Sequence, residues 1–146
     1  MHDFAFHRPT SVDAAAKAIG AASDGKFVAG GQTLLPTLRQ RLAQPSDMVD
    51  LSAIAELKGI KVEGDGVTIG AGTTHSEVAN SADVQKTIPG LAKLASLIGD
   101  HQVRQRGTIG GSVANNDPAA DYPAAELGLG ATIKTNKREI KADDFF

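Results

Sequence analysis

Two short glycine-rich segments constrain the fold of this chain more than any other feature. The first is Ala29–Thr33, which contains Gly30 and Gly31, and the second runs from Gly107 to Ser112. Glycine lets the backbone bend sharply and leaves its N–H groups uncovered by side chains. Such a segment suits an anion, so we expect the two segments to share one phosphate-bearing ligand.

The surroundings of the first segment strengthen this expectation. Residues 26–29 read as a short buried strand, and a helix is predicted from Thr33 to about Leu42, with Pro45 ending it. A helix N-terminus carries partial positive charge and spare N–H donors, so a phosphate could sit where the strand passes into the helix. The alternative, that Gly30 and Gly31 only make a tight turn, stays open at this point.

The first fifty residues predict strands joined by helices. Residues 4–8 alternate as a strand and Pro9 ends it, while Thr10 or Ser11 caps a helix that stops near Gly20. Residues 48–51 close the unit as a third strand. The predicted order is βαβαβ. In the second helix of this unit, the expected core-facing residues are Leu35, Leu38 and Leu42.

The rest of the chain has a different character. Residues 60–63 and 67–69 alternate on either side of Gly64–Gly66, which predicts a hairpin. Helices follow, and strands are expected at 131–134 and 139–140. We therefore predict an α+β protein of two lobes, a small one over residues 1–56 and a larger one over residues 57–146.

Several familiar catalytic and nucleotide motifs are absent. Gly70 and Gly72 follow a strand, but the third glycine of a dinucleotide fingerprint is missing, and the sequence has neither a P-loop nor a Gly-x-Ser-x-Gly elbow. The four histidines have no ligand-like spacing. Thr74 and Glu77 predict a capping box, which makes His75 a solvent-facing residue of a first helical turn; flavin attachment or acid–base work is the alternative. No catalytic residue and no metal site is predicted.

Composition narrows the chemistry further. The 146 residues carry a net charge of −2 with no basic face, which argues against a nucleic-acid or anionic-membrane partner. No apolar run approaches the length of a membrane span, and a cytoplasmic protein is expected. Cysteine is absent, so the chain cannot hold an iron–sulfur cluster through thiolates. Redox chemistry here would need an organic cofactor.

A family resemblance appears in the second glycine segment and its surroundings. Residues 102–112 and 117–123 closely resemble the second flavin loop of the molybdenum hydroxylase flavoproteins. These are the FAD-binding medium subunits of aerobic carbon monoxide dehydrogenase and its relatives, similar to the flavin domain of xanthine dehydrogenase. Residues 29–36 look like the first flavin loop of the same family. The match continues in residues 49–51, 69–74 and 144–146.

The resemblance implies a fold and a cofactor site. The fold would be the two-lobed α+β FAD-binding fold of the vanillyl-alcohol oxidase and carbon monoxide dehydrogenase flavoprotein type, with FAD between the lobes. Both segments would bind the pyrophosphate and adjoining ribityl or ribose groups, and Asp121 would accept a hydrogen bond from the cofactor. The implied cofactor-binding residues are Ala29, Gly30, Gly31, Gln32, Thr33, Thr108, Ile109, Gly110, Gly111, Ser112 and Asp121.

It also implies a role in a complex. A flavoprotein subunit of this family takes electrons from iron–sulfur clusters on a small partner subunit and passes them from FAD to an acceptor. The substrate is oxidised at a molybdenum cofactor on a large subunit, so this oxidoreductase subunit would not be active alone. The missing cysteines agree with clusters on a separate chain. Neither the substrate nor the acceptor can be deduced from the sequence.

The resemblance leaves one departure and two alternatives. The chain stops at Phe146, where the family continues, so we expect a flavin lobe incomplete at its C-terminus, weakened FAD binding, and exposed apolar surface that favours a homo-oligomer. One alternative is a truncated, flavin-free module that acts only in subunit association. The other is a flavin oxidase acting directly on small substrates, which is disfavoured because no base lies near the loops.

Overall fold

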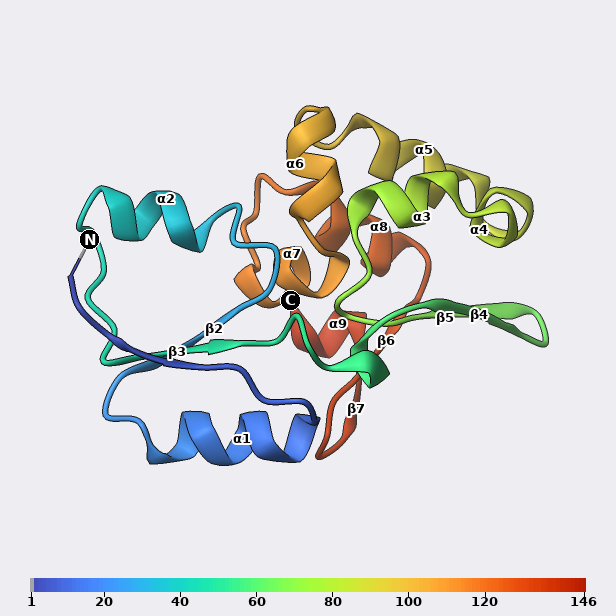
Figure 1. Cartoon of the computed structure of the whole chain (residues 1–146). Coiled ribbons are helices and arrows are strands. Elements are labelled where there is room, and N and C mark those ends of the chain that lie inside the picture. The colour runs from blue at the N-terminus through green and yellow to red at the C-terminus, as the bar shows by residue number, and fades with distance from the viewer. Residues whose placement is uncertain (1) are drawn as a thin grey trace.

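The computed structural model describes residues 2–146 as short helices and strands in the mixed order expected from the sequence (Figure 1). A three-stranded sheet and its two helices come first, and two hairpins and the remaining helices follow. The elements are β1 Ala5–His7, α1 Val12–Ala21, β2 Gly25–Val28, α2 Leu34–Arg39, β3 Asp47–Asp50, the 3-10 helix η1 Ala55–Leu57, β4 Ile60–Glu63, β5 Gly66–Ile69, α3 His75–Asn80, α4 Ala82–Thr87, α5 Pro89–Leu97, α6 His101–Arg106, α7 Ile109–Asn115, α8 Asp121–Gly128, β6 Thr132–Lys134, β7 Glu139–Lys141 and α9 Ala142–Phe145.

The first sheet confirms the predicted βαβαβ order. Its strands are all parallel and lie side by side as β1-β3-β2, so the third strand in the chain is central. Successive side chains of a strand point to opposite faces. Val49 accordingly packs against Ala15 of α1, and Met48 packs against Leu38 of α2. In Figure 1 the two helices lie on opposite sides of this sheet, α2 above and α1 below.

Two details of this unit differ from the sequence prediction. β2 is an edge strand, and Phe27 is 47% exposed, so the prediction of a buried strand at 26–29 was wrong for most of its length. The second helix was predicted to reach Leu42 but ends at Arg39, because Arg41 turns into the left-handed region at φ 59°. Leu42 is consequently 73% exposed, and Leu38 alone of the predicted apolar stripe is fully buried.

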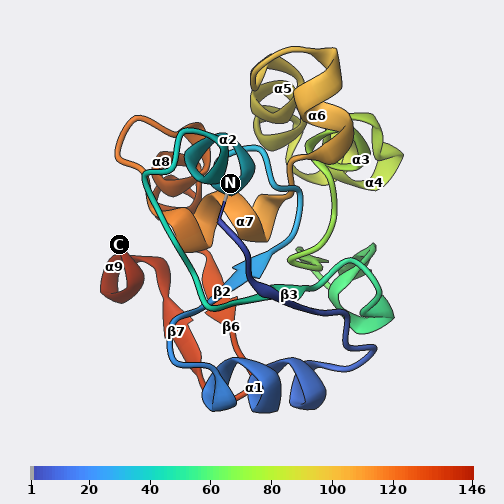
Figure 2. The ribbon, with the colours of Figure 1, turned by 60° about the vertical axis from the view of Figure 1, so that its left-hand side comes forward.

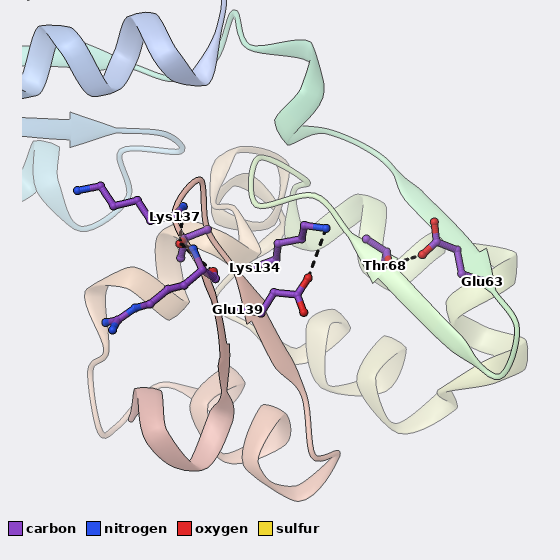
Figure 3. A network of polar contacts seen from close by, with 7 residues as sticks. Glu63, Thr68, Lys134, Lys137 and Glu139 are labelled. Carbon is purple, nitrogen blue, oxygen red and sulfur yellow. Dashed lines mark hydrogen bonds and ion pairs between the residues drawn. The ribbon is translucent and has the colours of Figure 1, made fainter.

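The predicted hairpin is present, and the strands expected at 131–134 and 139–140 pair as a second hairpin. β4 and β5 pair antiparallel, with Ile60 opposite Ile69, and β6 and β7 pair with Ile133 opposite Ile140. Exposed polar contacts follow these hairpins (Figure 3): the Thr68 hydroxyl donates to Glu63, and the Lys134 ammonium lies 3.4 Å from a Glu139 carboxylate oxygen. Since these side chains are exposed, their contacts contribute little to stability.

The helices between the hairpins carry the largest hydrophobic core. The capping box is confirmed, because the Thr74 hydroxyl accepts from the Glu77 N–H while the Glu77 carboxylate accepts from the Thr74 N–H. Pro89 occupies the first turn of α5, a position that needs no N–H partner. α5 buries its apolar stripe against α3 and α8. The buried members of this core are Val78, Val84, Leu91, Ala92, Ala95, Ile109, Val113 and Tyr122.

Among residues 2–146, buried hydrophobic side chains gather in three clusters. Two lie among residues 4–57, on the two faces of the first sheet, and the largest lies among residues 60–146. The division into lobes at residues 56 and 57 stays a prediction. Within residues 2–146, no helix combines the length and the apolar composition that crossing a bilayer requires.

Candidate functional site

The first glycine segment leaves the β2 strand and turns into α2 with its backbone donors free. Within the described residues, the N–H groups of Gly30, Gly31, Gln32 and Thr33 make no hydrogen bond to the protein. Gly31 has a φ of +73°, a conformation that favours glycine. The Gln32 side-chain amide donates to the Gly30 carbonyl at 3.2 Å, which braces the turn. Four adjacent free donors are what an oxyanion needs.

A shallow, open pocket of about 570 Å³ lies beside this segment. Its wall combines the apolar side chains of Leu35 and Pro36 with the exposed guanidinium group of Arg39. Leu35 was predicted to face the core, but it lines this pocket and is 38% exposed. The full lining is Gly31, Gln32, Leu35, Pro36, Arg39 and Gln40.

The second glycine segment is organised differently from the sequence expectation. Gly107 and Thr108 are extended, and a helix, α7, begins at Ile109 where a sharply bent loop was expected. The N–H groups of this helix start are occupied: Ile109 donates to the Thr73 carbonyl at 3.0 Å and Gly110 to the Ala71 carbonyl at 2.9 Å.

Thr108 completes the occupation of these donors. Its hydroxyl accepts from the Gly111 N–H at 3.1 Å, and its carbonyl accepts from the Ser112 N–H at 3.1 Å. The prediction that this segment offers uncovered N–H groups was therefore wrong for residues 109–112. Among them, the Ser112 hydroxyl is a side-chain donor that remains available, since no hydrogen bond within the described residues uses it.

The structure brings the two glycine segments into direct contact. A Cβ atom on Gly30 would lie 2.2 Å from the Arg106 carbonyl oxygen and 2.7 Å from the Gly107 Cα, so only glycine fits there. A Cβ on Gly110 would lie 2.4 Å from that of Ala71. Both glycines serve close backbone approach. The segments are far apart in sequence, and this contact is the feature that joins them into one candidate site.

The charged residues near the segments divide into two groups. The Arg104 guanidinium donates to the carbonyls of Ile98 and Gly99 at 3.2 Å, so this residue caps the end of α5. Arg106 and Asp121 are exposed and form no ion pair among residues 2–146. Asp121 begins α8, where its carboxylate agrees in sign with the helix dipole. Of the two arginines before the second segment, only Arg106 is therefore free for a ligand.

His75 is the largest departure from the sequence analysis. It was predicted to face solvent, but it is 5% exposed and lies directly beneath the second segment. Its backbone N–H donates to the Gly107 carbonyl at 3.0 Å, and its ring fills the space where a Gly107 side chain would go. The capping box correctly starts the helix, yet α3 turns its first residue inward because Thr74 and Thr108 form a β-bridge.

His75 belongs to a buried polar cluster with Tyr122 and Glu126. The rings of His75 and Tyr122 lie 5.4 Å apart, and His75 Nδ1, the Tyr122 hydroxyl and Glu126 Oε2 are all buried without a hydrogen-bond partner in the described chain. Burial lowers the pKa of His75 and raises the pKa of Glu126 to about 7. Burial is also the main reason that the pKa of Tyr122 is raised, with the carboxylates of Glu126 and Asp121 adding to it.

Sequence reasoning missed the residues that hold the second segment in place. The carbonyls of Ala71 and Thr73 accept from its backbone, and the His75 backbone N–H donates to it. The sequence analysis interpreted residues 69–74 as an incomplete dinucleotide fingerprint, as the start of a capping box at Thr74 and as part of a family resemblance. The available signal was the Gly70–Gly72 pair. Gly70 and Gly72 pack against the backbone of residues 57–58, and the Gly72 N–H donates to the Leu57 carbonyl. These two glycines allow the backbone after β5 to lie close against residues 57–58.

Comparison with known proteins decides the family. Residues 2–146, nearly the whole chain, match the model of the family described as the FAD binding domain in molybdopterin dehydrogenase. The chain belongs to this family. FAD is therefore the cofactor, and the predicted α+β flavoprotein fold is confirmed.

Individual members of the FAD-binding family are closely similar to the chain. It is 43% identical to the carbon monoxide dehydrogenase medium chain of Hydrogenophaga pseudoflava, covering 98% of this chain and 52% of that one. The solved carbon monoxide dehydrogenase from this organism, which lacks the Mo-pyranopterin moiety of its molybdenum cofactor, superposes with a TM-score of 0.94 at 43% identity, over 98% of this chain and 52% of that chain. Quinoline 2-oxidoreductase from Pseudomonas putida 86 gives a TM-score of 0.93 at 35% identity, with the same coverage of both chains. The chain spans about half the length of these relatives.

The described residues fit an FAD pyrophosphate at the first segment. The four free N–H groups of residues 30–33 supply donors, and a side chain on Gly30 would collide with the backbone across the contact. The Arg106 backbone lies at that contact, and its side chain is exposed and forms no ion pair among residues 2–146. The second segment fits as a wall with hydroxyl groups at Thr108 and Ser112, since its own N–H groups are largely used.

Proposed function

We propose that this chain forms the pyrophosphate-binding part of the FAD site in a flavoprotein subunit of a molybdenum hydroxylase complex. The observation that carries the proposal is the contact between Gly30 and the Arg106–Gly107 backbone, next to four free N–H groups. Family membership supports FAD as the ligand.

The residues proposed to hold FAD take different roles. The N–H groups of Gly30 to Thr33 donate to the pyrophosphate oxygens, and the Thr33 hydroxyl can add a donor. Ser112 and Thr108 offer hydroxyls to the ribityl or ribose groups, and Asp121 accepts from a cofactor hydroxyl. Ala29, Ile109, Gly110 and Gly111 shape the backbone around these donors. All eleven residues predicted from the sequence thus keep a place in the proposed site.

The chemistry of the proposed subunit comes from the cofactor. Bound FAD would supply a carrier of two electrons, while the protein would orient it and set its surroundings. The proposed partners are a small subunit with iron–sulfur clusters and a large subunit with the molybdenum cofactor. These 146 residues contain no cysteine and so hold no cluster through thiolates, which agrees with clusters on the small subunit. The names of the relatives support a dehydrogenase complex.

FAD binding by the purified chain tests the proposal. The chain is mixed with FAD, passed over a gel-filtration column and examined for flavin absorbance in the protein peak. We expect flavin to co-elute with the protein, and the variant Gly30→Ala to bind at least about tenfold more weakly, because its methyl group separates the two segments.

Gly20→Ala is the matched control for this experiment. Gly20 lies in α1, and a Cβ there meets nothing within 4 Å, so the same chemical change leaves FAD binding unaltered. A folded chain that never retains flavin would contradict the proposal and favour the flavin-free module. Equal binding by the two variants would show that the contact between the segments does not make the site.

A further inference from the structure

The His75 imidazole lies at the base of the contact between the glycine segments. A Cβ on Gly107 would lie 2.5 Å from His75 Nε2 and 2.8 Å from its Cδ2, so the ring tip touches the Gly107 backbone. The backbone N–H of His75 also donates a hydrogen bond to the Gly107 carbonyl at 3.0 Å. Residues 106–107, here called the strap, are therefore supported by both the backbone and the side chain of His75.

The strap in turn meets the first segment. Gly30 lies against the Arg106 carbonyl oxygen and the Gly107 Cα with no room for a methyl group. The His75 ring and Gly30 thus both lie against the strap, and neither contact has room for an added methyl group. Among close-packed groups, a displacement of one is passed to the next. The length of the side chain at position 75 consequently sets the position at which the strap meets Gly30.

We propose that His75 is a positioning residue for the FAD site and sets the contact between the strap and Gly30. The proposal rests on the proposed function, since it assumes that this contact builds the pyrophosphate site. His75 itself need not touch the cofactor. Its role follows from the reach of a buried ring whose Nδ1 has no hydrogen-bond partner in the described chain.

The surroundings of His75 favour a neutral ring that acts through its shape. Tyr122 covers it at 5.4 Å with the planes tilted by 35°, and Glu126 follows one turn later on α8. Burial lowers the pKa of His75, which keeps the ring uncharged at neutral pH. The charged or titratable residues on the other helices packed against α3 are all exposed except Arg104, which caps α5: Asp83, Lys86, Lys93, His101, Arg104 and Arg106.

Two amide variants of His75 are both polar but differ in side-chain length, so they test whether the length of the side chain matters. The terminal amide of His75→Gln reaches the position of Nε2, beneath the strap, whereas that of His75→Asn reaches only the position of Nδ1. The amide resonance of Gly30 in a ¹⁵N-resolved NMR spectrum reports on the strap at its contact with the first segment. We expect His75→Asn to shift this resonance and to weaken FAD binding roughly tenfold, and His75→Gln to leave both nearly unchanged.

Thermal unfolding and Tyr122→Phe provide the controls. Both His75 variants lose ring packing and should melt at similarly reduced temperatures, so a purely structural role would affect them alike. Tyr122→Phe keeps the covering ring and removes only a buried hydroxyl without a partner, and it should change neither the Gly30 resonance nor FAD binding. In the unsubstituted chain, a nuclear Overhauser effect is expected between the His75 ring and the Gly107 Hα.

The outcomes distinguish this proposal from the proposed function. If the Gly30 resonance responds to His75→Asn alone but no variant binds FAD, the positioning role stands and the FAD function fails. If FAD binds and both amide variants behave alike, the positioning role fails and the FAD function stands. Absence of the ring-to-Gly107 Overhauser effect in the unsubstituted chain overturns the positioning role even where a variant does not fold.

Discussion

Individual glycines in this chain serve unlike purposes, and only their contacts tell them apart. A methyl group on Gly30, Gly107 or Gly110 would collide with another segment, whereas one on Gly20 or Gly90 would meet nothing within 4 Å. The sequence places glycine in pairs at both segments but carries no record of what each faces. The same holds for His75, whose inward orientation depends on a β-bridge between residues 74 and 108.

Glu126 is a single residue whose charge should govern the pH dependence of stability. Burial raises its pKa to about 7 from an ordinary 4.5. Between these values the folded chain binds more protons than the unfolded chain, so stability is fully present below pH 4.5 and falls as the pH rises through 7. Glu126→Gln removes this loss, and at pH 8 it should raise the free energy of unfolding by about 1–2 kcal/mol, allowing for partial exposure.

Urea unfolding at pH 4.5 and pH 8 measures the effect of Glu126→Gln. The gain in the free energy of unfolding at pH 8 should shrink at pH 4.5, because Glu126 of the folded, unsubstituted chain is protonated and uncharged there. Asp65→Asn is the control, because this carboxylate is exposed in the turn between β4 and β5 and its neutralisation should leave the pH profile unchanged. A gain that is equal at both pH values would contradict a buried ionisation.

At the scale of elements, local patterns predicted most boundaries and missed the ones set by distant contacts. The hairpin at Gly64–Gly66, the capping box at Thr74 and the parallel unit all follow from alternation, capping and turn chemistry. The early end of α2 depends on the backbone of Arg41, and the helix start at Ile109 depends on carbonyls of residues 71 and 73. No local pattern reports such partners.

The capping box makes α3 a sensitive element, because this short helix carries His75 at its first position. Thr74→Ala removes the hydroxyl that accepts from the Glu77 N–H. We expect the free energy of unfolding to fall by about 1 kcal/mol, the usual cost of losing a cap. Chemical denaturation measures this loss.

Thr10→Ala is the matched comparison for the cap. Thr10 is exposed, precedes the Ser11 cap of α1, and makes no hydrogen bond through its side chain among the described residues. Its replacement should cost little. Equal losses from the two threonine variants would mean that the capping box does not stabilise α3 beyond the general effect of the substitution.

At the scale of the whole molecule, the candidate site lies between parts of the chain built in different ways. The first segment leaves a parallel sheet, while the second joins α6 to α7, and α7 contributes Ile109 and Val113 to the largest core (Figure 2). The two glycine segments could be identified from the sequence, and a ligand shared between them stays a prediction. The difference in free N–H groups between the two segments could not be predicted. The N–H groups of Ile109 and Gly110 donate to carbonyls of residues 73 and 71, which only the fold brings near.

The backbone donors of the first segment can be mapped directly. In a ¹⁵N-resolved NMR titration with FAD, and separately with inorganic pyrophosphate, the amide resonances of residues 30–33 should move most, because these N–H groups are free to bind the added anion. The amides of Ile109 and Gly110 should move less, since they already donate to Thr73 and Ala71. Movement confined to residues 109–112, or no movement with FAD, would contradict the account.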